Sequence, residues 1–209
     1  MFRFLLSSAA VFALAQPVLA QSVDVTGGVE LEFVFDDNND STQALIGYVE
    51  AESNGLYAGI WAQIANIDDY NEVDLYFGYR GETGQLAYDV YYTRYFFPNA
   101  GGDCCGDITL ELDYALNEQF SLGTELSYDP ESKGHGAFLV GGVAVTDQIS
   151  FEGKYGYFDV DSFRSNEWEI EASYAVTEAT SVTLTYADGE HYDPYYKLNL
   201  AWDFNILSR

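Results

Sequence analysis

The residues of this chain best suited to chemistry are carboxylates that recur at every second position. Pairs such as Glu30 with Glu32 alternate with apolar neighbours. Successive side chains of a strand point to opposite faces, so both members of a pair lie on one face. The acids on such polar faces are Glu30, Glu32, Asp74, Asp89, Glu111, Asp113, Glu125, Glu152, Glu169 and Glu171. Around a confined aqueous space they would repel anions and concentrate cations.

A second interpretation of these acids remains open. They could form a solvated face, stabilised by cross-strand pairs or divalent ions, with no path through the protein. Basic residues on the same segments balance them in part: Arg80, Arg94, Lys154 and Lys197. The polar faces stay acidic in sum under either interpretation.

Catalysis finds little support. His135 and His191 are the only histidines, and no serine near them stands in a G-x-S-x-G context. We expect no enzyme activity, no cofactor and no metal site. Cys104 and Cys105 are adjacent in a segment, 101–106, expected to be an exposed loop. A disulfide, two free thiols or a soft-metal contact are all open there.

The first twenty residues are typical of an export signal. Arg3 precedes an apolar stretch, residues 4–15, that is too short to span a membrane, and Ala20 ends a cleavage site. We expect a signal peptide at 1–20 and one domain at 21–209. Losing Arg3 leaves 7 basic and 34 acidic residues, a net charge of −27. Such a charge argues against nucleic acid as a partner.

Alternation of apolar and polar residues continues to the end of the chain and predicts an all-β fold. In the segments 42–65 and 136–145 both faces are apolar or the faces switch, so the register there is open. The template fits twelve strands, near 23–35, 42–53, 55–65, 72–80, 85–96, 107–116, 120–128, 136–145, 149–159, 167–174, 180–188 and 194–206.

The links between these segments alternate between long and short. Three short links are almost the same sequence: ALNEQFS at 115–121, AVTDQIS at 144–150 and AVTEATS at 175–181. Alternation places all short links at one end of the strands. The pattern predicts a single up-and-down antiparallel barrel of about twelve strands, typical of transmembrane barrels of the outer membrane.

Alternation alone does not decide which face meets water. Strand length and aromatic residues near strand ends favour a membrane barrel with its apolar face toward lipid. Those aromatic residues include Tyr76, Tyr91, Trp168 and Trp202. The last segment, 196–206, is similar to the terminal strand that barrel assembly machinery recognises. A soluble secreted β-sandwich that binds other molecules is the alternative.

Residues 53–98 carry a more specific similarity. SNGLYAGIWA and EVDLYFGYRGETGQLAYDVYYTRYFFPNAG resemble the TorF-like family of porins. The motif positions fall on Tyr57, Gly59 and Trp61, on 72–79 and on 88–98. The resemblance implies a barrel in the outer membrane. The loops at FVFDDNNDSTQAL and QIANIDDYN depart from the family pattern.

We therefore expect an outer-membrane protein of a Gram-negative bacterium, with outer-membrane lipid and the barrel assembly machinery as partners. Its function would be that of a porin, passing small cationic or neutral solutes by diffusion with a preference for cations. A non-conducting structural or surface-interaction barrel is the main alternative. The sequence leaves the solute, the oligomeric state and the openness of the lumen undecided.

Overall fold

The structure is a computed structural model that describes residues 23–36, 41–160 and 163–208. The expected signal peptide, residues 1–20, lies outside the described residues. In the described ranges no helix has the length and hydropathy that a membrane-spanning helix requires.

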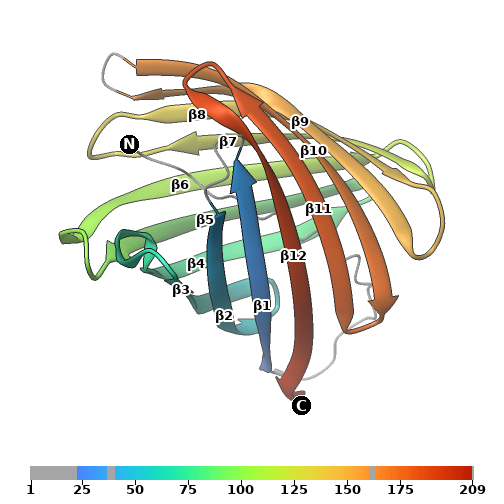
Figure 1. Ribbon diagram of the computed structural model, residues 1–209. Helices are drawn as coiled ribbons and strands as arrows, with labels where there is room; N and C mark the ends of the chain where they lie inside the picture. Colours follow the sequence, from blue (N-terminus) through green and yellow to red (C-terminus); the bar gives the residue numbers. More distant parts are fainter. Residues whose placement is uncertain (1–22, 37–40, 161–162, 209) are drawn as a thin grey trace.

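The described residues form twelve antiparallel strands that close into one barrel (Figure 1), as the sequence predicts. Each strand pairs with its neighbours in sequence, and β1 pairs with β12. The strands are β1 (Asp24–Asp36), β2 (Ser41–Ser53), β3 (Leu56–Ala65), β4 (Glu72–Thr83), β5 (Leu86–Phe97), β6 (Gly102–Ala115), β7 (Phe120–Tyr128), β8 (His135–Ala144), β9 (Ile149–Val160), β10 (Phe163–Thr177), β11 (Thr180–Gly189) and β12 (Tyr192–Leu207). A 3-10 turn, η1 (Asp68–Tyr70), lies between β3 and β4.

Links at 54–55, 84–85, 116–119, 145–148 and 178–179 share one end of the barrel, called here the short-turn end. The three similar sequences lie there and form similar turns. The third residue of each accepts a backbone N–H two residues ahead through its side-chain oxygen: Asn117 from Gln119, Thr146 from Gln148 and Thr177 from Ala179. The repetition therefore has a local cause, a side-chain acceptor at a tight turn.

The opposite end, called the loop end, differs from the sequence prediction. Several links there are shorter than expected because the strands run on: β6 begins at Gly102, β10 at Phe163 and β12 at Tyr192. Strict alternation of long and short links is therefore wrong. Hydrophobic alternation weakens before the backbone ladder ends, since hydrogen bonding between strands does not require an apolar face.

Cys104 and Cys105 lie in strand β6, so their placement in an exposed loop was wrong. They are joined to each other by a disulfide. Tyr95 pairs with Cys105 and Phe96 with Asp103, which leaves Cys104 as the extra residue of a β-bulge. Of the three states left open by the sequence, the structure contains the disulfide.

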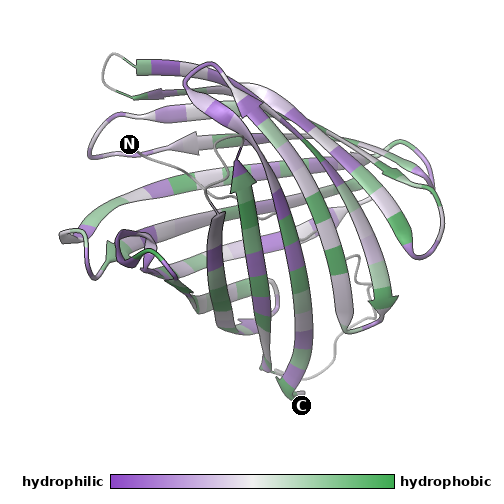
Figure 2. Ribbon diagram, in the orientation of Figure 1, coloured by the Kyte–Doolittle hydropathy of each residue, from purple (hydrophilic) through white to green (hydrophobic). Residues whose placement is uncertain are grey.

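The apolar face of the barrel points outward. Figure 2 shows hydrophobic and hydrophilic residues alternating along the strands. Large apolar side chains such as Leu31, Leu139 and Ile170 are exposed, whereas Glu32 and Lys197 are both 2% exposed. A soluble sandwich would bury the apolar side chains between two sheets, so this alternative does not fit.

Side-chain exposure also fixes the register of segments 42–65 and 136–145, which the sequence left open. Leu45, Val49 and Ile60 face outward, while Ala44 and Ile46 are buried on the inner wall. Leu139 faces outward and Phe138 inward. Both faces of segment 42–65 are apolar because its inner side belongs to an apolar cluster, described below.

Exterior aromatic residues lie toward both ends of the strands, as expected. Tyr186 contacts both Trp168 and Tyr196 toward the loop end, and Trp202 contacts Phe204 toward the short-turn end. Tyr76 and Tyr91 are exceptions, because both rings lie on the inner wall beside acids. Their assignment to the exterior was wrong.

Lysine placed on adjacent positions of β10 tests the orientation of the two faces. Ile170 is 53% exposed at the middle of the strand, and Glu171 is next to it on the inner wall. We expect Ile170→Lys to lower the free energy of unfolding in lipid vesicles by about 2–4 kcal/mol, because a cation would enter hydrocarbon. Glu171→Lys is the matched control and should change it by less than about 1 kcal/mol. Equal effects in urea titrations would contradict the assigned orientation.

Candidate functional site

The inner wall of the barrel carries all ten acids singled out in the sequence. Their strand neighbours on the outer face, among them Leu31, Leu75 and Ile170, are exposed apolar residues. Further acids lie on the same wall, among them Glu50, Glu52, Glu72, Asp107, Glu167 and Asp203. Sequence analysis missed Glu50 and Glu52, because the register of segment 42–65 was open. In the described ranges these carboxyl groups share the wall with three basic residues, Arg80, Lys154 and Lys197.

Arg94 is on the other face, so its expected contribution to the polar wall was wrong. It pairs with Leu75, an exposed exterior residue. Its guanidinium contacts Asp103 and Glu131, each at 2.6 Å, at the loop end. The inner wall is therefore more acidic than the sequence indicated.

Tyrosines hold several inner-wall acids in fixed positions. The Tyr48 hydroxyl donates to Asp203 Oδ1 at 2.8 Å, and the Tyr91 hydroxyl donates to Glu111 Oε1 at 2.8 Å. Tyr48 reaches from β2 to β12 across Gly28, where a Cβ atom would collide with its ring. The signal for these tyrosines was present in the sequence, since Tyr91 falls in the same period-2 register as Asp89.

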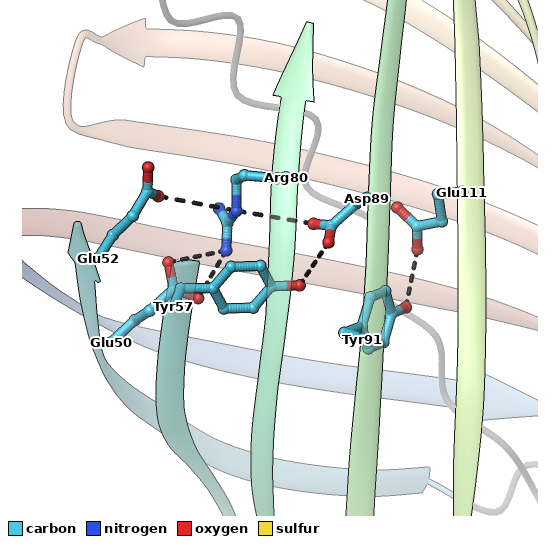
Figure 3. A network of polar contacts seen from close by, with 7 residues as sticks. All are labelled: Glu50, Glu52, Tyr57, Arg80, Asp89, Tyr91 and Glu111. Atoms are coloured by element: carbon cyan, nitrogen blue, oxygen red, sulfur yellow. Dashed lines mark hydrogen bonds and ion pairs between the residues drawn. The ribbon is translucent and has the colours of Figure 1, made fainter. Parts of the chain in front are cut away.

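A cluster around Arg80 lies near the short-turn end (Figure 3). One Nη atom of Arg80 donates to both carboxylate oxygens of Glu50, each at 2.9 Å. Its Nε lies 3.7 Å from Glu52 and 3.6 Å from Asp89. The Tyr57 ring supports the guanidinium, whose central carbon lies 3.7 Å from the ring centroid. Asp89 is thus the predicted acid that this cluster contains.

A second charge cluster lies around Lys154 on β9. Its ammonium contacts Glu125 Oε2 at 2.6 Å, and the two side chains are 6% and 4% exposed. The Phe138 ring lies 4.5 Å away. Four further predicted acids lie in this part of the wall, where Glu152 interacts electrostatically with Glu171, Glu169 and Asp113 and with Lys154 itself.

The remaining predicted acids lie apart from these clusters. Asn199 donates hydrogen bonds to both Glu30 and Glu32 near the seam of β1 with β12. Asp74 lies beside Glu72 toward the loop end of β4. The acids therefore line the wall at several depths and do not converge on one centre. Among the described residues no three acidic, histidine or cysteine side chains are arranged to hold a metal ion.

The link between β3 and β4 folds against the inner wall. Tyr70 of η1 packs on the apolar cluster of Ala44, Ile46 and Ala65. Its backbone carbonyl accepts a hydrogen bond from Gln63 Nε2 at 2.9 Å. The cluster explains why the sequence is apolar on both faces in segment 42–65.

The link between β7 and β8 is held by an ionised acid at the loop end. Asp129 accepts hydrogen bonds from Ser132 Oγ at 2.6 Å and from the Glu131 N–H at 2.7 Å. Burial acts to raise the pKa of Asp129, but these hydrogen bonds outweigh it and hold the pKa below its usual value. The link is therefore stabilised by the carboxylate and loses that contribution as pH falls through the lowered pKa.

Solved structures with a similar fold include porins and an outer membrane protein. The chain is similar to a KdgM porin, with a TM-score of 0.70 and 9% identity over 85% of this chain and 99% of that one. It is also similar to a NanC porin, with a TM-score of 0.64 and 11% identity over 83% of this chain and 98% of that one. Similarity to the Acinetobacter baumannii outer membrane protein Omp33 has a TM-score of 0.54 and 13% identity over 87% of this chain and 99% of that one. The fold is that of the porins.

These identities are low, so the similarity concerns the fold alone. No protein-family model and no curated protein matches the chain. The function must therefore be argued from the inner wall itself.

The Lys154–Glu125 pair allows a test of how tightly that wall is packed. Removing the cation with Lys154→Met leaves a buried carboxylate unpaired, and we expect a loss of about 3–5 kcal/mol in the free energy of unfolding. The double change Lys154→Met/Glu125→Leu should recover most of the loss. Urea titrations of refolded protein in lipid vesicles measure both. If the single change costs less than about 1 kcal/mol, water reaches the pair and the wall is more open than the structure indicates.

Proposed function

We propose that this chain is a porin of the outer membrane that passes small solutes by diffusion and prefers cations. The observation that carries the proposal is a closed barrel whose exterior is apolar and whose interior is acidic. Outer-membrane lipid would surround the exterior, and barrel assembly machinery would insert the protein. The similarity of residues 53–98 to the TorF-like family of porins agrees with this proposal.

The charge of the wall supports a preference for cations. The carboxyl groups of the wall far outnumber its three basic side chains, Arg80, Lys154 and Lys197, and leave a large negative excess. Inside a barrel the field of these charges is focused by low-dielectric walls. Cations would gather in the lumen, and anions would be repelled.

The same charge argues against polyanionic solutes. One solved KdgM porin is described as a complex with disordered oligogalacturonate, a chain of acidic sugars. An acidic wall would repel such a chain. We propose that the fold shared with KdgM serves solutes of the opposite or of no charge in this protein.

Crowding of the wall supports a limit on solute size. Thr185, Lys197, Glu32 and Glu125 are almost fully buried by other inner side chains. A twelve-stranded barrel is only modestly wider than the eight-stranded ones that side chains fill. The passage would therefore admit ions and small molecules. The same crowding favours the second candidate, a barrel that does not conduct and acts through its surface.

Planar bilayers separate the two candidates. We expect refolded protein to conduct, with a reversal potential in a KCl gradient that favours K⁺ over Cl⁻. The preference should weaken between 0.1 M and 1 M salt, because the screening length falls from about 10 Å to about 3 Å. At either salt concentration, the double variant Glu169→Gln/Glu171→Gln should prefer K⁺ over Cl⁻ less strongly than the unchanged protein.

Two results would count against the proposal. A reversal potential that favours Cl⁻ would reject the preference for cations. Absence of conductance from protein with the heat-modifiable gel migration of a folded barrel would favour the non-conducting candidate.

A further inference from the structure

The Arg80 cluster has the composition of a receptor for an organic cation. Glu50 and Glu52 come from β2, Tyr57 from β3 and Asp89 from β5, so side chains of three strands surround the guanidinium of Arg80 on β4. These four residues are called the cage. Three carboxylates and one aromatic face are the groups that bind guanidinium and ammonium ions in proteins.

The cage is held rigidly in place. The Tyr57 hydroxyl donates to Asp89 Oδ1 at 2.6 Å, which fixes both the ring and the carboxylate. The ring can lie across the wall because the neighbouring residue is Gly78, where a Cβ atom would lie 2.6 Å from the Tyr57 hydroxyl oxygen. A backbone hydrogen bond of 2.9 Å from Arg80 N to Gly55 O ties β4 to the turn between β2 and β3. A preorganised site of this kind binds with little loss of entropy.

Arg80 does not satisfy the cage. Three carboxylates face one guanidinium, and only Glu50 receives hydrogen bonds from it. The Nε atom is buried and makes no hydrogen bond, since Glu52 and Asp89 lie at 3.7 and 3.6 Å. The Arg80 side chain is nevertheless 39% exposed, so it can leave the cage toward the lumen. Figure 3 shows the guanidinium lying between Glu52 and Asp89.

We propose that the cage is a binding site for solutes with a guanidinium or primary ammonium group, and that Arg80 is its intrinsic competitor. This inference rests on the proposed function, in which such solutes cross the lumen. A solute cation that enters from the lumen takes the position of the Arg80 guanidinium between Glu50 and the Tyr57 ring. Arg80 swings into the lumen, and its return expels the solute.

Competition between Arg80 and the solute cation for the cage would allow the solute to be released quickly, as transport requires. A cage left empty would hold an organic cation too firmly to release it, whereas a tethered guanidinium keeps occupancy brief. A channel needs binding that is favourable enough for entry and weak enough for exit. Arg80 would therefore set the preference for organic cations over K⁺, because K⁺ gains less from the planar pair of hydrogen bonds to Glu50.

Methylguanidinium is the probe for this site. We expect it to bind Arg80→Ala at least tenfold more tightly than the unchanged protein, in saturation-transfer NMR on refolded full-length chain in detergent. Arg80→Gln/Glu52→Gln keeps the net charge of the cluster, leaves Glu50 and Tyr57 in place, and should still bind more tightly than the unchanged protein. Adding Tyr57→Leu to Arg80→Ala should weaken binding about tenfold, which corresponds to about 1.4 kcal/mol.

Lys197→Gln is the matched control. It removes another inner-wall cation, one that acts on Glu30 and Glu169, and it should not improve methylguanidinium binding. The proposal would be overturned if the unchanged protein and Arg80→Ala bound methylguanidinium with equal affinity. It would also be overturned if adding Tyr57→Leu to Arg80→Ala left that affinity unchanged. Improvement by Lys197→Gln equal to that by Arg80→Ala would overturn it too, because binding would then follow total charge alone.

Folding of the variants is scored by heat-modifiable gel migration. If Arg80→Ala refolds only when methylguanidinium is added, that rescue supports the proposal. If neither Arg80 variant refolds with the probe present, the proposal fails, because the cage would require its own arginine. NMR binding does not depend on conductance, so failure of the proposed channel function would be seen separately, in bilayers.

Discussion

Closure of the backbone ladder between β1 and β12 is the constraint on which the rest of the structure depends. In hydrocarbon no water can pair with an open strand edge, so every backbone N–H and C=O must find a partner within the sheet. The β1–β12 register runs from Val25 with Leu207 to Asp36 with Tyr195. Side chains reinforce this seam from within, because Tyr48 crosses over Gly28 to reach Asp203. Glycine at position 28 is what lets the ring approach the backbone.

An apolar exterior leaves the polar residues to the interior, where each charge must be compensated. Tyrosine hydroxyls donate hydrogen bonds to Asp203 and Glu111. Lys154 forms an ion pair with Glu125, and Arg80 forms one with Glu50. The compensation is incomplete, since acids far outnumber bases on the wall. Complete pairing would have made the interior an inert polar core. The surplus is what makes a cation-preferring lumen the best-supported function and the Arg80 cage a site with unused binding capacity.

The sequence predicted the strand number, the antiparallel order and the polar face, because period-2 alternation reports directly on which side each residue faces. Prediction from the sequence failed where successive residues do not differ clearly in polarity, or where a residue type suits either face. Tyr76 and Tyr91 are amphipathic and suit either face, and Arg94 lies on the outer face near the loop end, where Asp103 and Glu131 pair with it. The Arg80 cage could not be predicted, since its members come from three strands and their meeting depends on the register between these strands and β4.

Fluorescence quenching by lipids with brominated acyl chains tests the central claim most directly. Trp202 lies on the exterior at 53% exposure, whereas Trp61 packs against the inner cluster of Ala44, Ile46 and Ala65. In vesicles, a variant that keeps only Trp202 should be strongly quenched, and a variant that keeps only Trp61 should be quenched weakly or not at all. Strong quenching of Trp61 with little effect on Trp202 would contradict the account.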